Sequence, residues 1–466
     1  MKLFKVKAFL LFAFVLLLFF IPIKSIKAQD ADSLLIDKLT KETFISDVMY
    51  QNLWYLCKNI GGRIAGSPQA ALAVEWSKKV METMGMDTVY KQPIMVHKWS
   101  AGDYKEQAWY YTPTQGKIDV AVCALGESIG TDWKGIKAEI IEVKSFKELA
   151  AIGKGTIQGK IIFFNRPMDP SFLNTFEAYG GAADQRVHGA AEAAKYGAVG
   201  VIVRSLTLSN DKFPHTGVMH YDSAYPKIPA IAISTKDADI LSEENKKNPL
   251  LQFFFRTMCE SALDVRSHNV IGEIKGSVYP DQIITIGGHI DSWWLGEGAH
   301  DDGAGCVQTI EIARLFIKLG IKPKRTLRFV MFMDEEIAQR GGAAYVKMAQ
   351  DKKEKHYAAL ESDEGGLLPK GFTFDTTEEK VNVWLPYIKY FKPMGIYEFS
   401  KGYSGVDIKH LKDLNATCIG LSTNSQAYFN YHHSGNDTFE NVNKRELQMG
   451  AAAMAALIYL MDKYDL

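Results

Sequence analysis

IITIGGHIDSWWLGEGAHDDGAG, residues 283–305, joins a short apolar run to a loop that is rich in glycine, histidine and aspartate. The apolar run predicts a buried strand, and the stretch CVQTIEIARLFIKLG that follows predicts an amphipathic helix ending at Gly320. His289 therefore stands where a strand ends, and Asp301 lies in the loop that leads into a helix. Active sites of α/β proteins usually form at this carboxyl edge of the sheet.

The same succession of strand, loop and helix continues toward the C-terminus. TLRFVMFMDEE, YAALESDEGG and NATCIGLST predict three further strands, and MGAAAMAALIYLMDKY predicts a closing helix. Strands that alternate with helices favour an α/β fold in which helices flank a mostly parallel central sheet.

The chain before this region is organised differently. Helices are predicted over residues 34–59 and 69–84, with the loop GGRIAGSP between them, and a strand-rich stretch follows. Further along, short β-branched runs alternate with turns and with a small-residue helix over residues 187–198. We therefore expect a main domain in two parts, residues 29–115 and 263–466, around a smaller α/β insert of residues 116–262.

The N-terminus predicts export from the cytoplasm. Three lysines precede an apolar run of about 16 residues, and small Ala28 precedes a polar stretch. This pattern predicts a signal peptide over residues 1–28 and a secreted or periplasmic protein without membrane association after cleavage. The alternative is a retained membrane anchor, but the run is shorter than the roughly 20 residues of a spanning helix.

Composition excludes several classes of protein. The formal net charge is zero and no basic cluster occurs, which argues against a nucleic-acid partner. Five widely spaced cysteines are too few for a disulfide scaffold in 466 residues. The histidines of the insert, His188, His215 and His220, are scattered, and we expect ordinary polar contacts for them.

Five potential metal ligands stand at or just past the apolar runs. They are His289, Asp301, Glu336, Asp363 and His433. Two histidines and three carboxylates could hold two zinc ions with one carboxylate shared, and imidazole ligands favour zinc over magnesium. His432 is an alternative to His433 as the last member of this set.

Two further acids are candidates for catalysis. Asp291 lies two residues after His289 on an extended segment, so its carboxylate is expected to accept a hydrogen bond from the imidazole. Glu335 and Glu336 are adjacent and diverge, so one can bind metal while Glu335 transfers a proton as general acid/base. Each fragment alone also has a structural interpretation, such as a helix cap at Asp301 and Asp302. The whole ordered set favours the metal site.

These fragments resemble the co-catalytic di-zinc aminopeptidase family, over essentially all of the mature chain. The matching motifs are GGHIDSW, GAHDDGAG, the EE of MFMDEE, ESDEGG and HHSGNDT, and GRIAGSP resembles a further family segment. The resemblance implies that His289 and Asp363 bind one zinc, Glu336 and His433 the other, and that Asp301 bridges them. It also implies a cis Asp301–Asp302 peptide bond and a position near the substrate pocket for Asp407. The insert resembles a protease-associated domain.

The resemblance implies a secreted, homodimeric di-zinc exopeptidase that hydrolyses dipeptides or short peptides with free termini by metal-activated water. Glu335 would take a proton from that water and deliver it to the leaving amine. One departure from the family is Asp334, where many relatives have a non-acidic residue. Three alternatives are an amidohydrolase acting on N-acyl amino acids, a non-catalytic receptor-like relative and a single-zinc glutaminyl cyclase.

Overall fold

The computed structural model describes residues 30–466, so the predicted signal peptide lies outside the described residues. Both sheets belong to one compact unit, Leu39–Leu466. Within the described residues, no helix is both long and apolar enough to cross a membrane.

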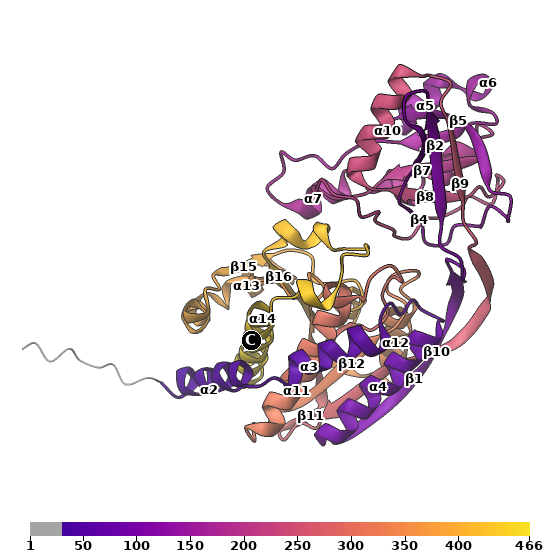
Figure 1. The fold of residues 1–466 in the computed structure, drawn as a ribbon. Coiled ribbons are helices and arrows are strands. Elements are labelled where there is room, and N and C mark those ends of the chain that lie inside the picture. The colour runs from indigo at the N-terminus through magenta and orange to yellow at the C-terminus, as the bar shows by residue number, and fades with distance from the viewer. Residues whose placement is uncertain (1–29) are drawn as a thin grey trace, which may run out of the picture. The chain divides into compact units, whose positions relative to one another are not determined.

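The first sheet has eight strands in the order β1-β10-β12-β11-β13-β16-β14-β15 (Figure 1). The strands β12, β11, β13 and β16 are mutually parallel and form its centre. The pairs β1–β10, β10–β12 and β14–β16 are antiparallel, and β15 pairs parallel with β14. The bounds are β1 Thr88–Ser100, β10 Glu260–Ile274, β11 Tyr279–His289, β12 Arg325–Phe332, β13 Lys355–Glu361, β14 Pro369–Asp375, β15 Glu398–Lys401 and β16 Thr417–Thr423. All eight residues of β12 are buried, as expected of a central parallel strand.

Helices pack against this sheet and against one another. Helix α4 contacts β1 and β10, α12 contacts β1, and α11 contacts β11, α3 and α14. The bounds are α2 Ala31–Ile45, α3 Val48–Tyr55, α4 Pro68–Met84, α11 Ala304–Lys318, α12 Arg340–Asp351, α13 Glu378–Asn382 and α14 Lys444–Tyr464. Helix α4 begins with Ser67, whose side chain accepts a hydrogen bond from the Ala70 amide and so caps the helix.

The second sheet has eight strands in the order β3-β2-β9-β5-β6-β7-β8-β4. Its strands β5 to β8 are parallel, and the remaining strands join antiparallel. The strands are β2 Gln107–Thr112, β3 Gly116–Asp119, β4 Val122–Ala124, β5 Ile136–Val143, β6 Ile161–Phe164, β7 Gly200–Arg204, β8 Ala230–Ile233 and β9 Gln252–Arg256. The helices are α5 Phe146–Ile152, α6 Lys154–Ile157, α7 Thr175–Gly180, α8 Asp184–Val187, α9 Gly189–Ala194 and α10 Thr235–Lys247.

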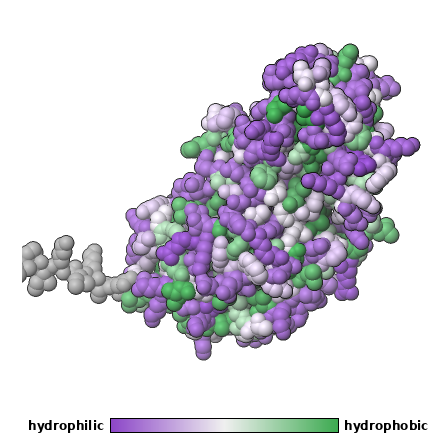
Figure 2. All heavy atoms as spheres, viewed as in Figure 1, coloured by the Kyte–Doolittle hydropathy of each residue, from purple (hydrophilic) through white to green (hydrophobic). Residues whose placement is uncertain are grey.

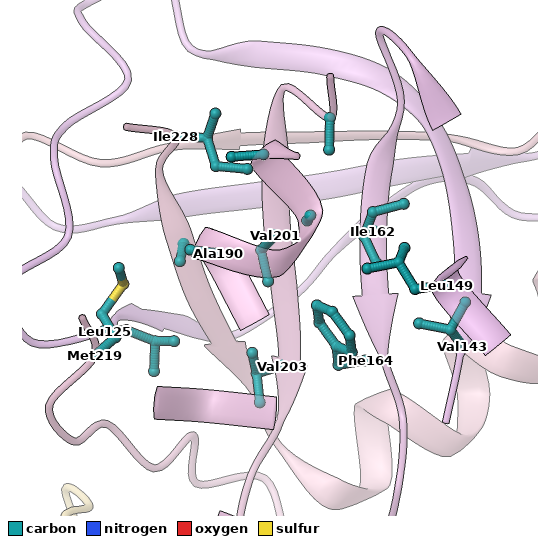
Figure 3. Packing of buried hydrophobic residues seen from close by; sticks show 14 of the residues in the cluster. Leu125, Val143, Leu149, Ile162, Phe164, Ala190, Val201, Val203, Met219 and Ile228 are labelled. Atoms are coloured by element: carbon teal, nitrogen blue, oxygen red, sulfur yellow. The ribbon is translucent and has the colours of Figure 1, made fainter. Parts of the chain in front are cut away.

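The second sheet has apolar clusters on both faces. Ile162, Phe164, Val201 and Val203 point to one face, where Ala190 and Leu149 pack against them (Figure 3). The neighbouring residues of the same strands, such as Phe163 and Ile202, belong to the other cluster. The alternation follows from the two-residue repeat of a strand. On the face drawn in Figure 2, polar residues dominate and hydrophobic ones are scattered in small groups.

The predicted α/β fold with a mostly parallel central sheet is confirmed, and the secondary structure differs in detail. The single helix expected over residues 34–59 is wrong, because α2 and α3 are separate and a π-helical turn, Leu56–Ile60, follows. At the break, the Ser46 hydroxyl accepts a hydrogen bond from the Val48 amide and competes with the helical backbone bonds. The helix expected over 187–198 is shorter, and β14 and β15 were not expected. The second sheet begins at Gln107, before the predicted boundary at Gly116.

Candidate metal centre and active site

The predicted metal ligands lie beyond the carboxyl ends of the four central parallel strands. His289 ends β11 and Asp301 follows in the loop before α11, while Glu336 lies just past β12. Asp363 lies two residues past β13, and His433 lies in the loop after β16. Parallel strands bring their carboxyl ends to one edge, which is how five residues far apart in the sequence come together.

Asp301 stands between the two histidines. Its Oδ1 lies 3.3 Å from Nε2 of His289, and its Oδ2 lies 3.3 Å from Nε2 of His433. The carboxylate therefore faces a different imidazole with each oxygen. The Asp301–Asp302 peptide bond is cis, as the resemblance implied.

Each histidine has a second carboxylate of its own. Oδ1 of Asp363 lies 3.2 Å from Nε2 of His289, and Oε2 of Glu336 lies 3.0 Å from Nε2 of His433. The cluster thus has two halves, His289 with Asp363 and His433 with Glu336, and Asp301 is common to both. This is the same pairing that the resemblance implied.

Asp302 and His432 lie close to the cluster, and their contacts differ from those of the five. The Asp302 carboxylate accepts hydrogen bonds from the backbone amides of His289 and Gly305, at 3.1 and 2.9 Å, which commits both oxygens to the protein backbone. Nε2 of His432 lies 3.9 Å from Asp301 Oδ2, farther than the corresponding atom of His433. The geometry favours His433 over His432 for a shared ion.

Glu335 faces the same cluster without being part of either half. Its Oε2 lies 4.0 Å from Nε2 of His289, and its side chain is 14% exposed. Burial, together with repulsion from Asp363 and Glu336, raises the pKa of Glu335 well above its usual value. A carboxyl group that holds a proton this readily suits a general acid/base.

The predicted hydrogen bond between the Asp291 carboxylate and the His289 imidazole is wrong. Nδ1–H of His289 donates instead to the main-chain carbonyl of Asp291, at 3.1 Å. The Asp291 carboxylate is already occupied, because it accepts from the backbone amides of Asp334, Glu335 and Glu336 at 2.8, 3.2 and 3.4 Å. Asp291 thus fixes the His289 tautomer through its backbone and holds the Glu335–Glu336 segment through its side chain.

Asp334 and Asp407 add two buried carboxyl groups around this centre. Burial and the nearby Asp291 raise the pKa of Asp334 to about 8, and its oxygens have no hydrogen-bond partner in the described residues. Both carboxylate oxygens of Asp407 are likewise buried without a partner, and burial with repulsion from Glu361 and Glu335 raises its pKa well above the usual value. Asp407 therefore lies near Glu335, and its neighbours Gly405 and Val406 line the cavity described below. Its position near the substrate pocket stays a prediction.

The donor set fits zinc. Oδ2 of Asp301 and Oε1 of Glu336 are buried and accept no hydrogen bond in the described part of the chain. Burial and repulsion from Asp301 raise the pKa of Glu336 to about 7. Buried carboxylates of this kind need a cation or a donor, and two imidazole nitrogens with carboxylate oxygens are the ligands that zinc prefers.

Two residues outside the predicted set hold the loop that carries Asp301. Arg63 is fully buried and donates to the carbonyls of Ile290, Glu297 and Gly298, at 2.5, 2.8 and 3.0 Å. The Asp437 carboxylate accepts from the backbone amides of His300 and Asp301, at 2.7 and 3.2 Å. Both residues belong to motifs noted in the sequence, GRIAGSP and HHSGNDT, but nothing local marks them as supports of a loop more than 130 residues away in the chain.

A cavity of about 1450 Å³ opens onto this centre. One part of its wall consists of the cluster itself, including Asp301, Glu335 and His433. Another part comes from the region of the second sheet, including Tyr179 and Arg186. The cavity is large enough for a small ligand with two or more residues.

Comparison with known proteins identifies the family. The family model described as Peptidase family M28 matches residues 269–458. Carboxypeptidase Q of Bos taurus is 32% identical over 412 residues, covering 88% of this chain and 84% of that protein, and the Xenopus laevis protein is 32% identical with 88% and 85% coverage.

Solved structures give the same result. A Peptidase M28 precursor from Shewanella amazonensis has a TM-score of 0.88 and 32% identity, covering 93% of this chain and 97% of that one. A zinc aminopeptidase from Bacillus subtilis shares the fold, with a TM-score of 0.62, 20% identity and coverage of 88% and 94%. The resemblance predicted from the motifs is thereby confirmed, and the chain belongs to peptidase family M28, as a metallo-exopeptidase.

Proposed function

We propose that this protein is a secreted exopeptidase that uses two zinc ions to hydrolyse dipeptides or short peptides with free termini. The observation that carries the proposal is the position of Asp301, whose two oxygens each lie 3.3 Å from a different histidine. A carboxylate shared in this way suits a pair of ions roughly 3.5–4 Å apart.

In this proposal the five ligands form two sets, one for each ion, according to the distances between the histidines and the carboxylates. His289 and Asp363 would hold one ion, Glu336 and His433 would hold the other, and both would share Asp301. When bound, the two ions would lower the pKa of a water molecule and polarise the carbonyl of the scissile bond. His289 offers Nε2 to the ion because its Nδ1–H donates to the Asp291 carbonyl.

Glu335 is the proposed general acid/base. It lines the cavity beside the cluster, and its backbone amide is fixed to the Asp291 carboxylate. Its carboxylate would take a proton from the attacking water and then deliver it to the departing amine. Asp291 would act as a positioning residue, because it holds the amides of both Glu335 and Glu336.

The proposal extends to the rest of the chain. Residues 1–28 would act as a cleaved signal peptide, and residues 116–262 would form a protease-associated insert between two parts of the peptidase domain, residues 29–115 and 263–466. Support for the insert is the second sheet with its own apolar clusters, although that sheet also includes β2, which lies before residue 116. The mature protein would be a homodimer.

Glu335→Gln tests this function. The variant should keep two zinc ions per chain, measured by metal analysis, and lose turnover of an alanyl dipeptide by roughly 10²- to 10⁴-fold, the usual contribution of an acid/base. Glu243→Gln is the matched control, because Glu243 is exposed and pairs with Lys246 on α10.

The same assay should include N-acetylalanine and a run with chelator. The wild type should cleave the free dipeptide in preference to the N-acyl amino acid and should lose activity when metal is removed. Full activity of Glu335→Gln would overturn the assignment of Glu335. A preference for the N-acyl substrate would overturn the peptidase assignment in favour of an amidohydrolase.

A further inference from the structure

The carboxylate of Glu364 lines the cavity at the active site and has no part in the proposed mechanism. Its Oε2 accepts a hydrogen bond from the Thr423 amide at 2.8 Å, and its main-chain carbonyl accepts one from the Thr423 hydroxyl at 3.0 Å. Within residues 30–466, no lysine, arginine or histidine lies within ion-pair distance of this carboxylate, and Lys370, which also lines the cavity, is exposed. Glu364 is thus held by a neutral residue, and no cation in that range pairs with it.

Glu364 lies beside the proposed metal cluster rather than in it. Its neighbour Asp363 has Oδ1 at 3.2 Å from Nε2 of His289. Among the described residues, the groups of side chains that are close enough together to share a metal ion do not include Glu364. Its carboxylate is bonded instead to Thr423, the last residue of the neighbouring strand β16. A cation bound by Glu364 would therefore lie beside the reacting centre.

Aromatic side chains form the cavity wall next to Glu364. Phe176, Tyr428 and Phe429 line the cavity, with ring centres 5.5 Å apart for Phe176 and Tyr428 and 5.3 Å apart for Tyr428 and Phe429. At Gly365, the residue after Glu364, a Cβ would come within 3.3 Å of the Tyr428 ring. Glycine, which has a φ of +76° here, therefore lets this ring approach the backbone directly beside Glu364. The cavity at this point combines an aromatic surface with a carboxylate.

A basic side chain of the substrate would match this combination. Its alkyl stem can pack on aromatic rings while its charged head pairs with an acid. A half-buried carboxylate without a cation is unfavourable unless a ligand supplies the positive charge. The α-ammonium group of a peptide stays beside the scissile carbonyl at the metal centre, whereas a long side chain can reach Glu364. We propose, resting on the proposed function, that Glu364 binds the positively charged side chain of the substrate's first residue and so selects peptides that begin with lysine or arginine.

The test compares lysyl-alanine with norleucyl-alanine, whose side chain lacks the ammonium group, using the zinc-loaded full chain. The wild type should favour the lysyl peptide by roughly 10- to 100-fold in kcat/KM, the value of a hydrogen bond to a charged group. Glu364→Gln should remove this preference, because its amide oxygen can still accept from the Thr423 amide but it has no charge. Glu364→Asp should keep part of the preference, because it retains the charge on a shorter side chain.

A binding measurement tests the same point without turnover. Free lysine should raise the Tm of the zinc-loaded wild type more than free norleucine does, and Glu364→Gln should abolish that difference. Glu177→Gln is the matched control, because Glu177 lies in the first turn of α7, lines the same cavity and is exposed. It removes a negative charge from the cavity and should leave the preference for lysine as it is in the wild type.

The outcomes separate this inference from the proposed function. A wild type that does not distinguish lysine from norleucine in either assay would overturn the role of Glu364 and leave the two-zinc peptidase intact. Equal losses on both peptides in Glu364→Gln would also overturn it, and would indicate a group that both peptides share, such as the α-ammonium. A loss of the preference in Glu177→Gln would overturn the assignment to Glu364. A zinc-loaded wild type that cleaves neither peptide but still binds lysine in preference to norleucine would overturn the peptidase function and keep the cation site.

Discussion

The two sheets of this protein each have parallel strands that end beside a cavity, and the chemistry at those two edges differs. At the first edge, β11, β12, β13 and β16 end beside the His289–His433 cluster. At the second, β5, β6 and β7 end beside a cavity of about 870 Å³ that Glu142, Asn165 and Arg204 help to line. The two edges therefore have the same position in their sheets, and each lies beside a cavity.

The difference lies in whether the carboxylates have hydrogen-bond or ion-pair partners. At the second edge, Asn165 donates to Glu142 at 2.7 Å, Ser242 donates to Glu142 at 2.8 Å, and Arg204 pairs with Asp239 at 2.6 Å. At the first edge, one buried oxygen of each of two carboxylates, Oδ2 of Asp301 and Oε1 of Glu336, accepts no hydrogen bond from the described residues. Carboxylates without partners at the first edge favour a bound cation there. The presence of a cavity and the strand topology alone would not distinguish the first edge from the second.

Aspartate-to-asparagine substitutions at the two edges should differ most in zinc content and in turnover. Asp301→Asn should lower bound zinc from two ions to at most one per chain and reduce turnover to background, because the shared carboxylate is lost. Asp239→Asn should keep both ions and full turnover, because Asp239 pairs with Arg204 and lines the cavity of the second sheet.

Metal analysis and dipeptide turnover on the same samples check this contrast. Two bound zinc ions in Asp301→Asn would contradict the bridging role. A comparable loss of activity in Asp239→Asn would contradict the distinction between the edges.

The stability of the metal-free protein should depend on pH because of the buried acids near the metal centre. Burial, with repulsion from Asp363, raises the pKa of Glu364 to about 7, although the Thr423 amide opposes the shift. Between its ordinary value and about 7, the folded chain holds a proton that the unfolded chain has released. Stability from this group is therefore present at low pH and lost as the pH rises through 7.

In chelator, we expect the Glu364 carboxyl to contribute on the order of 2 kcal/mol more to the free energy of unfolding at pH 5.5 than at pH 7.5, measured as the difference between the wild type and Glu364→Gln. Thermal unfolding in chelator at several pH values measures this, and Glu364→Gln should reduce the slope. Zinc should flatten it as well, since cations would offset the charge of Asp363. Equal pH slopes for the wild type and Glu364→Gln in chelator would contradict the raised pKa of Glu364.

Features of the fold and site that depend on neighbouring residues in the sequence could be predicted, and those that depend on contacts between distant residues could not. The strands β11, β12, β13 and β16 were predictable because each is a short apolar run followed by a loop. Their shared carboxyl edge then brings His289, Glu336 and Asp363 together without further information. The stretch between β14 and β16 was not predictable, because it consists mainly of short 3₁₀ turns with no periodic pattern.

The supporting residues escaped prediction because their partners are distant in the sequence. Arg63 reaches a loop 227 residues away, and Asp437 reaches back 137 residues to His300. The Asp291 side chain was assigned the wrong hydrogen bond because the three amides that occupy it come from another strand end.

The smallest expected effect concerns the second edge alone. Arg204→Gln removes the ion pair with Asp239, whose side chain is 57% exposed, and the 3.2 Å hydrogen bond to Asn165. A pair exposed to this degree contributes about 1 kcal/mol or less, so Tm should fall by about 1–2 °C. Turnover and zinc content should not change, because the network holds no ligand and no substrate. Calorimetry measures the Tm, and an activity assay on the same samples measures turnover. If turnover fell by more than the loss of folded protein explains, the second edge would also contribute to the reaction.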